Sequence, residues 1–239
     1  MKIEVLYPEL CNLYGDLANA KYLARSAGAE LINTALSDQP RFVTEDVAMV
    51  YMGGTTERGQ IIVRDAFAPY LEDLKKRTEA GGLTLITGNA MEIFGEYIED
   101  EDGSREAMLN LFPFHADRHF MNRYNSLYLG KLADEGQDMD IVGFKSQFGH
   151  SYGVNDEPLF RTVRGAGINP AEKAEGIRRH NLMATYVIGP LVMLNPPFAK
   201  YLLRLMGVKE PALAFEQAAM DVYAHRLEQF SEPDRGFIY

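Results

Sequence analysis

The sequence has a single cysteine, Cys11, and no tryptophan in 239 residues. One cysteine excludes an internal disulfide and cysteine-rich zinc sites, and it is typical of a protein in a reducing cytoplasm. The sequence also lacks an apolar run long enough to cross a bilayer. The N-terminal stretch carries Glu4 among apolar neighbours, which indicates a strand rather than a signal peptide. We therefore expect a cytoplasmic protein that makes no membrane contact.

Basic side chains are fewer than acidic ones, at 24 against 34, and the formal net charge is −10. This charge argues against a protein that binds the phosphate backbone of a nucleic acid. The five histidines are scattered without metal-ligand spacing, so we expect no metal and no cofactor. Each histidine is interpreted as a surface or hydrogen-bonded structural residue.

The first 95 residues alternate between β-rich and helical segments. Apolar runs predict strands at residues 2–7, 29–34, 47–51 and 83–86, with helices between them. Such an alternation predicts a parallel sheet with helices on both faces. Ligand sites in these sheets lie at the carboxyl ends of the strands, which here are Gly53-Gly54 and Thr87-Gly88-Asn89.

The second half of the chain reads differently. The acidic segment 96–105 is expected to be an exposed loop. Shorter strands are predicted near residues 124–129, 140–144, 159–163 and 182–188, and proline-opened helices at 196–206 and 211–230. Residues 231–239 are expected to form a flexible tail. No repeat or linker divides the sequence, so we expect a single domain over residues 1–239.

The segment 83–95, LTLITGNAMEIFG, runs from a buried strand through a glycine turn into a helix. This is the layout of a nucleophile elbow, which raises one side chain above the sheet and directs backbone N–H groups toward an oxyanion. The raised side chain would be Thr87. From spacing alone, an ordinary strand-to-helix turn explains both this segment and Gly53-Gly54 better than a catalytic site does.

Six segments taken together carry a stronger pattern. They are Leu6–Asp16 (LYPELCNLYGD), Gly53–Gln60 (GGTTERGQ), Leu85–Gly95, Gly143–Gly149, Val163–Asn169 and Thr185–Leu191 (TYVIGPL). In this order they resemble the class I glutamine amidotransferases of the cobyric-acid-synthase type. The resemblance is closest to the glutaminase subunit of lipid II isoglutaminyl synthase, which works beside a Mur-ligase-like partner.

The resemblance implies a three-layer, flavodoxin-like α/β fold with a mostly parallel central sheet and helices on both faces. It places the family's I-C-G-G-Y-Q-x-L-G elbow on Leu85–Gly95, with the cysteine at Thr87. The Tyr-Gln pair then falls on Met91-Glu92 after an extra residue, Ala90, or on Ala90-Met91 in a gap-free match. The family's catalytic histidine falls on Ile188. The substrate-binding positions that it implies are Gly53, Gly54, Gly88, Asn89, Arg123 and Gln147.

Arg123 matches an arginine that the isoglutaminyl branch uses to hold glutamine, and a solvated surface arginine is an equally good interpretation. A threonine hydroxyl is far less acidic than a thiol, and isoleucine cannot exchange a proton. Losing one member of such a catalytic unit costs on the order of 10⁴–10⁶ in rate.

We therefore expect a pseudoenzyme that supports a Mur-ligase-like partner in peptidoglycan synthesis. One alternative is an active amidotransferase or hydrolase with altered chemistry at the Thr87 elbow. Another is a protein that binds glutamine or a related small amide or amino acid. The pathway, cell-wall or cobalamin-type, stays open.

Overall fold

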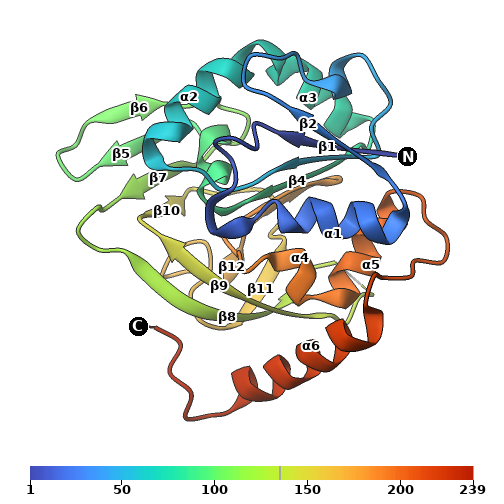
Figure 1. Ribbon diagram of the computed structural model, residues 1–239. Coiled ribbons are helices and arrows are strands. Elements are labelled where there is room, and N and C mark those ends of the chain that lie inside the picture. The colour runs from blue at the N-terminus through green and yellow to red at the C-terminus, as the bar shows by residue number, and fades with distance from the viewer. Residues whose placement is uncertain (135, 239) are drawn as a thin grey trace.

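The computed structural model describes residues 1–134 and 136–238. At its centre is a six-stranded sheet in the order β13-β14-β4-β3-β1-β2, parallel except for β13 (Figure 1). Its strands are Lys2–Leu6 (β1), Glu30–Thr34 (β2), Met49–Met52 (β3), Leu83–Thr87 (β4), Ile177–Arg179 (β13) and Leu182–Thr185 (β14). The parallel sheet predicted for the first 95 residues is confirmed.

Helices cover both faces of this sheet, as predicted (Figure 1). The α-helices are Ala18–Ala27 (α1), Glu57–Phe67 (α2), Leu71–Glu79 (α3), Leu191–Leu194 (α4), Pro196–Leu205 (α5) and Glu216–Ser231 (α6). Short 3₁₀ helices are Leu13–Gly15 (η1), Arg41–Val43 (η2), Ala68–Tyr70 (η3) and Gly88–Phe94 (η4). The segment after Thr87 is therefore a 3₁₀ helix.

Two apolar cores lie on the two faces of the sheet, and β3 contributes to both. Met49 and Tyr51 pack on the side of α1 and α5, whereas Val50 and Met52 pack on the side of α2 and α3. This alternation follows from the two-residue period of a strand, and it explains why a strand buried on both faces is an unbroken apolar run.

The helical segment between β3 and β4 is divided in two by η3. Pro69 has no N–H to continue the α-helical hydrogen bonds, so the chain tightens there before α3 begins. At its start, α2 is capped as the sequence predicts, because the Thr56 hydroxyl accepts a hydrogen bond from the Gly59 N–H at 3.0 Å.

Two further four-stranded sheets, β10-β7-β5-β6 and β12-β11-β8-β9, were not predicted as sheets. Their strands are Tyr97–Asp100 (β5), Arg105–Ala107 (β6), His115–Arg118 (β7), Tyr124–Leu132 (β8), Asp140–Gln147 (β9), Gly149–Tyr152 (β10), Phe160–Arg164 (β11) and Ala174–Glu175 (β12). The predicted loop at 96–105 is thus wrong. This segment contains β5 and the first residue of β6. Ile98 of β5 is buried against Met108 and Ala116, which favours a strand over an exposed loop.

The C-terminal segment differs from the prediction in two ways. Helix α6 begins at Glu216 rather than at Pro211, after Phe215 in a left-handed conformation. Residues 232–238 return along β8 instead of extending as a free tail: the Leu127 N–H donates to the Phe237 carbonyl at 2.8 Å. The Arg164 guanidinium donates to several carbonyls of this return, Glu232 among them at 2.6 Å. Tyr239, the last residue of the predicted tail, lies outside the described residues.

Candidate ligand-binding cavity at the carboxyl end of the sheet

A cavity of about 330 Å³ lies beyond the carboxyl ends of β3 and β4. It is large enough for a small metabolite. Its lining residues are Leu13, Tyr14, Gly54, Thr56, Glu57, Gly88, Asn89, Arg123, Ser146, Gln147, Phe148 and Ile188. A wider hollow of about 620 Å³ lies near Arg77 and Met206, at the opposite end of these strands, where parallel sheets do not place ligand sites.

The cavity brings together six of the eight predicted site residues. They are Gly54, Gly88, Asn89, Arg123, Gln147 and Ile188. Sequence reasoning missed the other lining residues. Of these, Glu57 could have been found, because it follows the glycine turn within a segment already singled out. Tyr14 and Phe148 also lie within singled-out segments, Leu6–Asp16 and Gly143–Gly149, but nothing in those segments indicated which side chains would face the cavity.

Thr87 does not line the cavity, contrary to the expectation that its side chain is raised above the sheet. Its backbone is extended, with φ −123° and ψ 154°, and its side chain is fully buried. The Thr87 hydroxyl donates to Asp16 Oδ2 at 2.6 Å and lies 2.8 Å from the Tyr51 hydroxyl. Thr87 also pairs with Thr185 of β14, so it belongs to the strand rather than to the turn.

Asp16 lies just before α1, but Leu17 takes the N-cap position of this helix. The buried Asp16 carboxylate instead accepts hydrogen bonds from Thr87, from Asn19 and from the Gly54 N–H. Burial raises the pKa of this carboxyl. Asp16 therefore ties the end of β4 to the glycine turn after β3.

Gly53 is buried beneath the turn rather than exposed to the cavity. A Cβ atom at this position would lie 2.6 Å from the Cys11 carbonyl oxygen, so only glycine fits. Cys11 itself is fully buried, and burial raises the pKa of its thiol to about 12. The one cysteine of the chain is thus neither in the cavity nor a ready thiolate.

Asn89 joins the two glycine turns. Its Oδ1 accepts a hydrogen bond from the Thr55 N–H at 3.0 Å, and its carbonyl accepts one from Gln60 Nε2 at 2.8 Å. These contacts engage the side-chain oxygen and the backbone carbonyl of Asn89, and neither involves its Nδ2 group. They indicate that this residue fixes the cavity wall.

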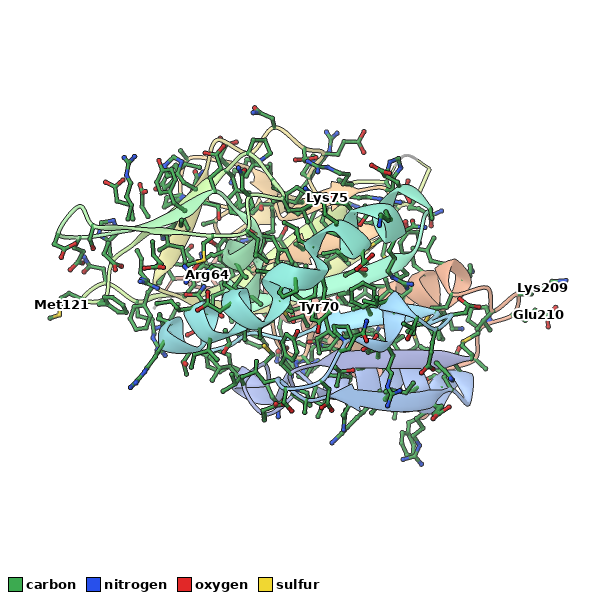
Figure 2. The ribbon with its side chains drawn as sticks, turned by 90° about the horizontal axis from the view of Figure 1, so that it is seen from above. Arg64, Tyr70, Lys75, Met121, Lys209 and Glu210 are labelled. Carbon is green, nitrogen blue, oxygen red and sulfur yellow. The ribbon has the colours of Figure 1, made fainter. Side chains whose placement is uncertain are left out.

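Arg123 stands at the cavity mouth. Its guanidinium lies 4.4 Å from the centre of the Phe148 ring, and its Nη1 lies 3.3 Å from the Tyr14 hydroxyl. Two residues earlier, Met121 is 85% exposed and projects from the end of the molecule opposite Lys209 and Glu210 (Figure 2). The mouth therefore combines a cation with an exposed apolar loop.

Gln147 is almost completely buried, and its two side-chain polar atoms differ in their hydrogen bonding. Its Nε2 donates to the Gly149 carbonyl at 2.6 Å, but its Oε1 has no hydrogen-bond partner among the described residues. An unpaired buried acceptor costs on the order of 1–3 kcal/mol. A ligand that donates a hydrogen bond to this oxygen would recover that cost.

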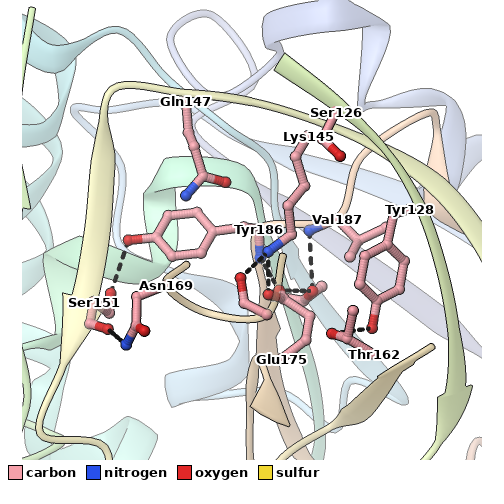
Figure 3. Close-up of polar contacts among 12 residues, drawn as sticks. Ser126, Tyr128, Lys145, Gln147, Ser151, Thr162, Asn169, Glu175, Tyr186 and Val187 are labelled. Atoms are coloured by element: carbon pink, nitrogen blue, oxygen red, sulfur yellow. Dashed lines mark hydrogen bonds and ion pairs between the residues drawn. The ribbon is translucent and has the colours of Figure 1, made fainter. Parts of the chain in front are cut away.

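Behind Gln147 lies a buried ion pair between Lys145 and Glu175 (Figure 3). Glu175 Oε1 accepts hydrogen bonds from the Thr185 hydroxyl at 2.8 Å and from the Tyr186 N–H at 2.9 Å. Lys145 also donates to the Gly167 carbonyl. Burial lowers the pKa of Lys145, while Glu175 opposes that effect. Neither residue was predicted from the sequence to pair with the other.

The cavity lining offers few side chains that could act as a nucleophile or a base. This lining, in the part of the chain that the structure describes, contains neither a thiol nor an imidazole, and Ile188 forms an apolar wall. No group of three or more metal-ligating side chains occurs in residues 1–134 and 136–238. Within the same ranges, no helix has both the length and the apolarity needed to cross a bilayer.

The parallel sheet and the cavity between its two glycine turns define a glutamine amidotransferase-type α/β domain. The fold is similar to that of a PurLQS structure from Thermotoga maritima, with a TM-score of 0.55 at 12% identity, covering 95% of this chain and 98% of that one. It is also similar to the glutaminase domain of Trypanosoma brucei CTPS, with a TM-score of 0.53 at 10% identity, covering 90% and 96%.

The sequence comparison is more specific. The model of the CobB/CobQ-like glutamine amidotransferase domain matches residues 2–193, and the chain belongs to this family. Two relatives are subunits GatD of lipid II isoglutaminyl synthase (glutamine-hydrolyzing). The one from Streptococcus pneumoniae is 25% identical over 205 residues, which are 83% of this chain and 77% of that protein. The one from Staphylococcus aureus is 25% identical over 215 residues, which are 88% and 85%. The predicted family and fold class are confirmed.

Proposed function

We propose that this protein is a catalytically degenerate glutamine amidotransferase subunit that supports a Mur-ligase-like partner in the amidation of lipid II. The observation that carries the proposal is the cavity itself. Ile188 occupies the position implied for the base, and Thr87 is buried under the floor with its hydroxyl bonded to Asp16. A cysteine amidotransferase needs a nucleophile and a base within hydrogen-bond reach.

The partner is inferred from the relatives. Both are named as subunits of a lipid II isoglutaminyl synthase, and family membership extends over residues 2–193. The scaffold segments of the family are retained here while the chemical positions are changed. Retention of the scaffold without the chemistry is what a supporting subunit requires.

The test is co-expression of this chain with the Mur-ligase-like protein of the same organism. We expect the two to co-purify as a stable complex that hydrolyses glutamine no faster than a blank. A GatD subunit from Staphylococcus aureus with its own partner serves as the positive control. Glutamine turnover by the complex that is abolished by Thr87→Ala would contradict the degenerate assignment, and failure to co-purify would contradict the assigned partner.

A second candidate function, binding of a small amide or amino acid, is favoured by the unpartnered Gln147 Oε1. A ligand that binds only the folded state raises the melting temperature. We expect glutamine or a related amide to raise the melting temperature of the wild type but not of Gln147→Leu. An unchanged melting temperature across a series of amides and amino acids would contradict ligand binding. The supporting role would then be the one proposed function that remains.

A further inference from the structure

We infer that Gly88, not Thr87, occupies the apex of the elbow, so that the catalytic position of the family holds no side chain at all in this protein. The inference deepens the proposed function and rests on it in one respect, because it takes the cavity to be the vacated catalytic site. On this inference, the cysteine of the family corresponds to a glycine, which has no side chain. It does not correspond to a threonine, in which a hydroxyl would replace the thiol.

Backbone conformation is the first argument. A nucleophile elbow is a sharp, strained turn between a strand and a helix. Thr87 is extended and still paired within the sheet, whereas Gly88 has a φ of +66° and opens η4. The residue of this turn that has the left-handed conformation is therefore Gly88.

The direction of the side chain is the second argument. A Cβ atom built on Gly88 would lie 3.6 Å from Ile188 Cγ2 and 3.1 Å from the Gly54 Cα. It would thus stand in the cavity, between the position implied for the base and the glycine turn after β3. The Thr87 side chain, in contrast, is directed at Asp16 and has no exposed surface.

The third argument is independent of the geometry. When the family pattern I-C-G-G-Y-Q-x-L-G is placed with its cysteine on Thr87, either Ala90 is left over or, without a gap, the last glycine falls on Phe94. A shift by one residue places the cysteine on Gly88 and needs no insertion. Glu92 then stands at the glutamine, Phe94 at the leucine and Gly95 at the last glycine. Thr87 takes the place of the isoleucine, a buried β-branched residue like itself.

A side chain at residue 88 is sterically feasible. The nearest contact of a new Cβ, 3.1 Å to the Gly54 Cα, requires a shift of a few tenths of an ångström. A non-glycine residue with positive φ costs on the order of 1–3 kcal/mol. Gly103 provides a matched control, because it has a φ of +81°, is exposed and has nothing within 4 Å of its Cβ direction.

Thiol accessibility tests the inference directly. Cys11, the one native cysteine, is buried, so the wild type serves as the blank. Gly88→Cys, Thr87→Cys and Gly103→Cys are treated with iodoacetamide in the folded state, and alkylation is followed by intact mass. We expect Gly88→Cys to react at least about tenfold faster than Thr87→Cys, because only the former thiol reaches the cavity.

Ile188→His is then added to each cavity variant. An imidazole beside a thiol favours the thiolate. We expect the pH profile of alkylation to move to lower pH for Gly88→Cys with Ile188→His, and to stay unchanged for Thr87→Cys with Ile188→His. These readouts do not depend on a partner or on glutamine, so they are separate from the test of the proposed function.

The inference is overturned if Thr87→Cys reacts as fast as Gly103→Cys, or if Ile188→His moves the pH profile of Thr87→Cys and not that of Gly88→Cys. Should Gly88→Cys fail to fold, Thr87→Cys still decides the matter. Slow alkylation of that variant, at the rate of the wild type, supports the inference because it shows that residue 87 does not reach the cavity.

Discussion

Two regions at the carboxyl end of the sheet differ in the kind of residue that they contain. Gly88 and Ile188 line the cavity, at the positions that we assign to the vacated catalytic site. The layer beneath it is polar and paired: Thr87 bonds to Asp16, and Lys145 pairs with Glu175. The two assigned positions in the cavity therefore have no polar side-chain group, whereas the layer beneath has polar side chains that are buried and paired.

The difference follows from the cost of change in each place. Replacing a side chain that faces a solvent-filled cavity leaves no unsatisfied partner, so the free energy of unfolding changes little. Removing one member of a buried pair leaves a desolvated charge or hydroxyl behind, which is strongly destabilising. Side chains that face the cavity can therefore change with little loss of stability, even if catalysis is lost. The buried, paired side chains beneath them cannot.

The largest effect is expected at the buried ion pair. Lys145→Met leaves Glu175 charged and unpaired in the interior, and it should reduce the free energy of unfolding by about 3–5 kcal/mol. The double variant Lys145→Met with Glu175→Gln should recover much of that loss. Urea unfolding measures all of these values.

The control for this prediction is the exposed pair of Lys131 with Asp138. Lys131→Met should cost no more than about 1 kcal/mol. Equal effects of Lys145→Met and Lys131→Met would contradict the view that the layer beneath the cavity is the constrained region.

An intermediate effect is expected for Thr87. Thr87→Val keeps the shape of the side chain but removes the donor to Asp16, and it should cost about 1–3 kcal/mol in the free energy of unfolding. Thr84→Val is the matched control on the same strand, because the buried Thr84 hydroxyl has no partner among the described residues. That change should be neutral or slightly stabilising. A loss at Thr84 as large as that at Thr87 would remove the structural role assigned to the Thr87 hydroxyl.

The sequence predicts the central fold well because the signals are local. Unbroken apolar runs, such as residues 47–51, and the glycine turns that follow them specify buried parallel strands. The sheet β10-β7-β5-β6 escaped prediction because β5 is a half-buried strand. Its buried residue, Ile98, lies among acidic neighbours that suggest a loop.

The candidate site was predicted in its location but not in its detail. The glycine turns place it at the right end of the sheet, and Arg123 and Gln147 reach it as expected. What the sequence could not show is the direction of adjacent side chains. Thr87 and Gly88 are neighbours in the chain, yet a change in φ from −123° to +66° separates a strand residue from a cavity residue.

The smallest effect concerns His150, which connects the two regions. Its Nδ1 lies 3.4 Å from Gln147 Nε2 on the cavity side, and its ring packs edge-on against Tyr124 at 5.4 Å. Burial, and then the charges of Lys145 and His119, lower the pKa of His150 from 6.5 to about 4. The folded state therefore favours the neutral ring, whereas the unfolded chain binds a proton near pH 6.5.

The stability from this neutral ring is present above pH 6.5 and is lost as the pH falls toward 4, because protonation then favours the unfolded chain. Between pH 7 and pH 5 we expect a loss of about 1 kcal/mol after allowance for the partial exposure of the ring. His150→Gln should remove this part of the pH dependence, and His225→Gln on the exposed face of α6 should retain it. Parallel pH profiles for the wild type and His150→Gln would contradict the lowered pKa of His150 in the folded state.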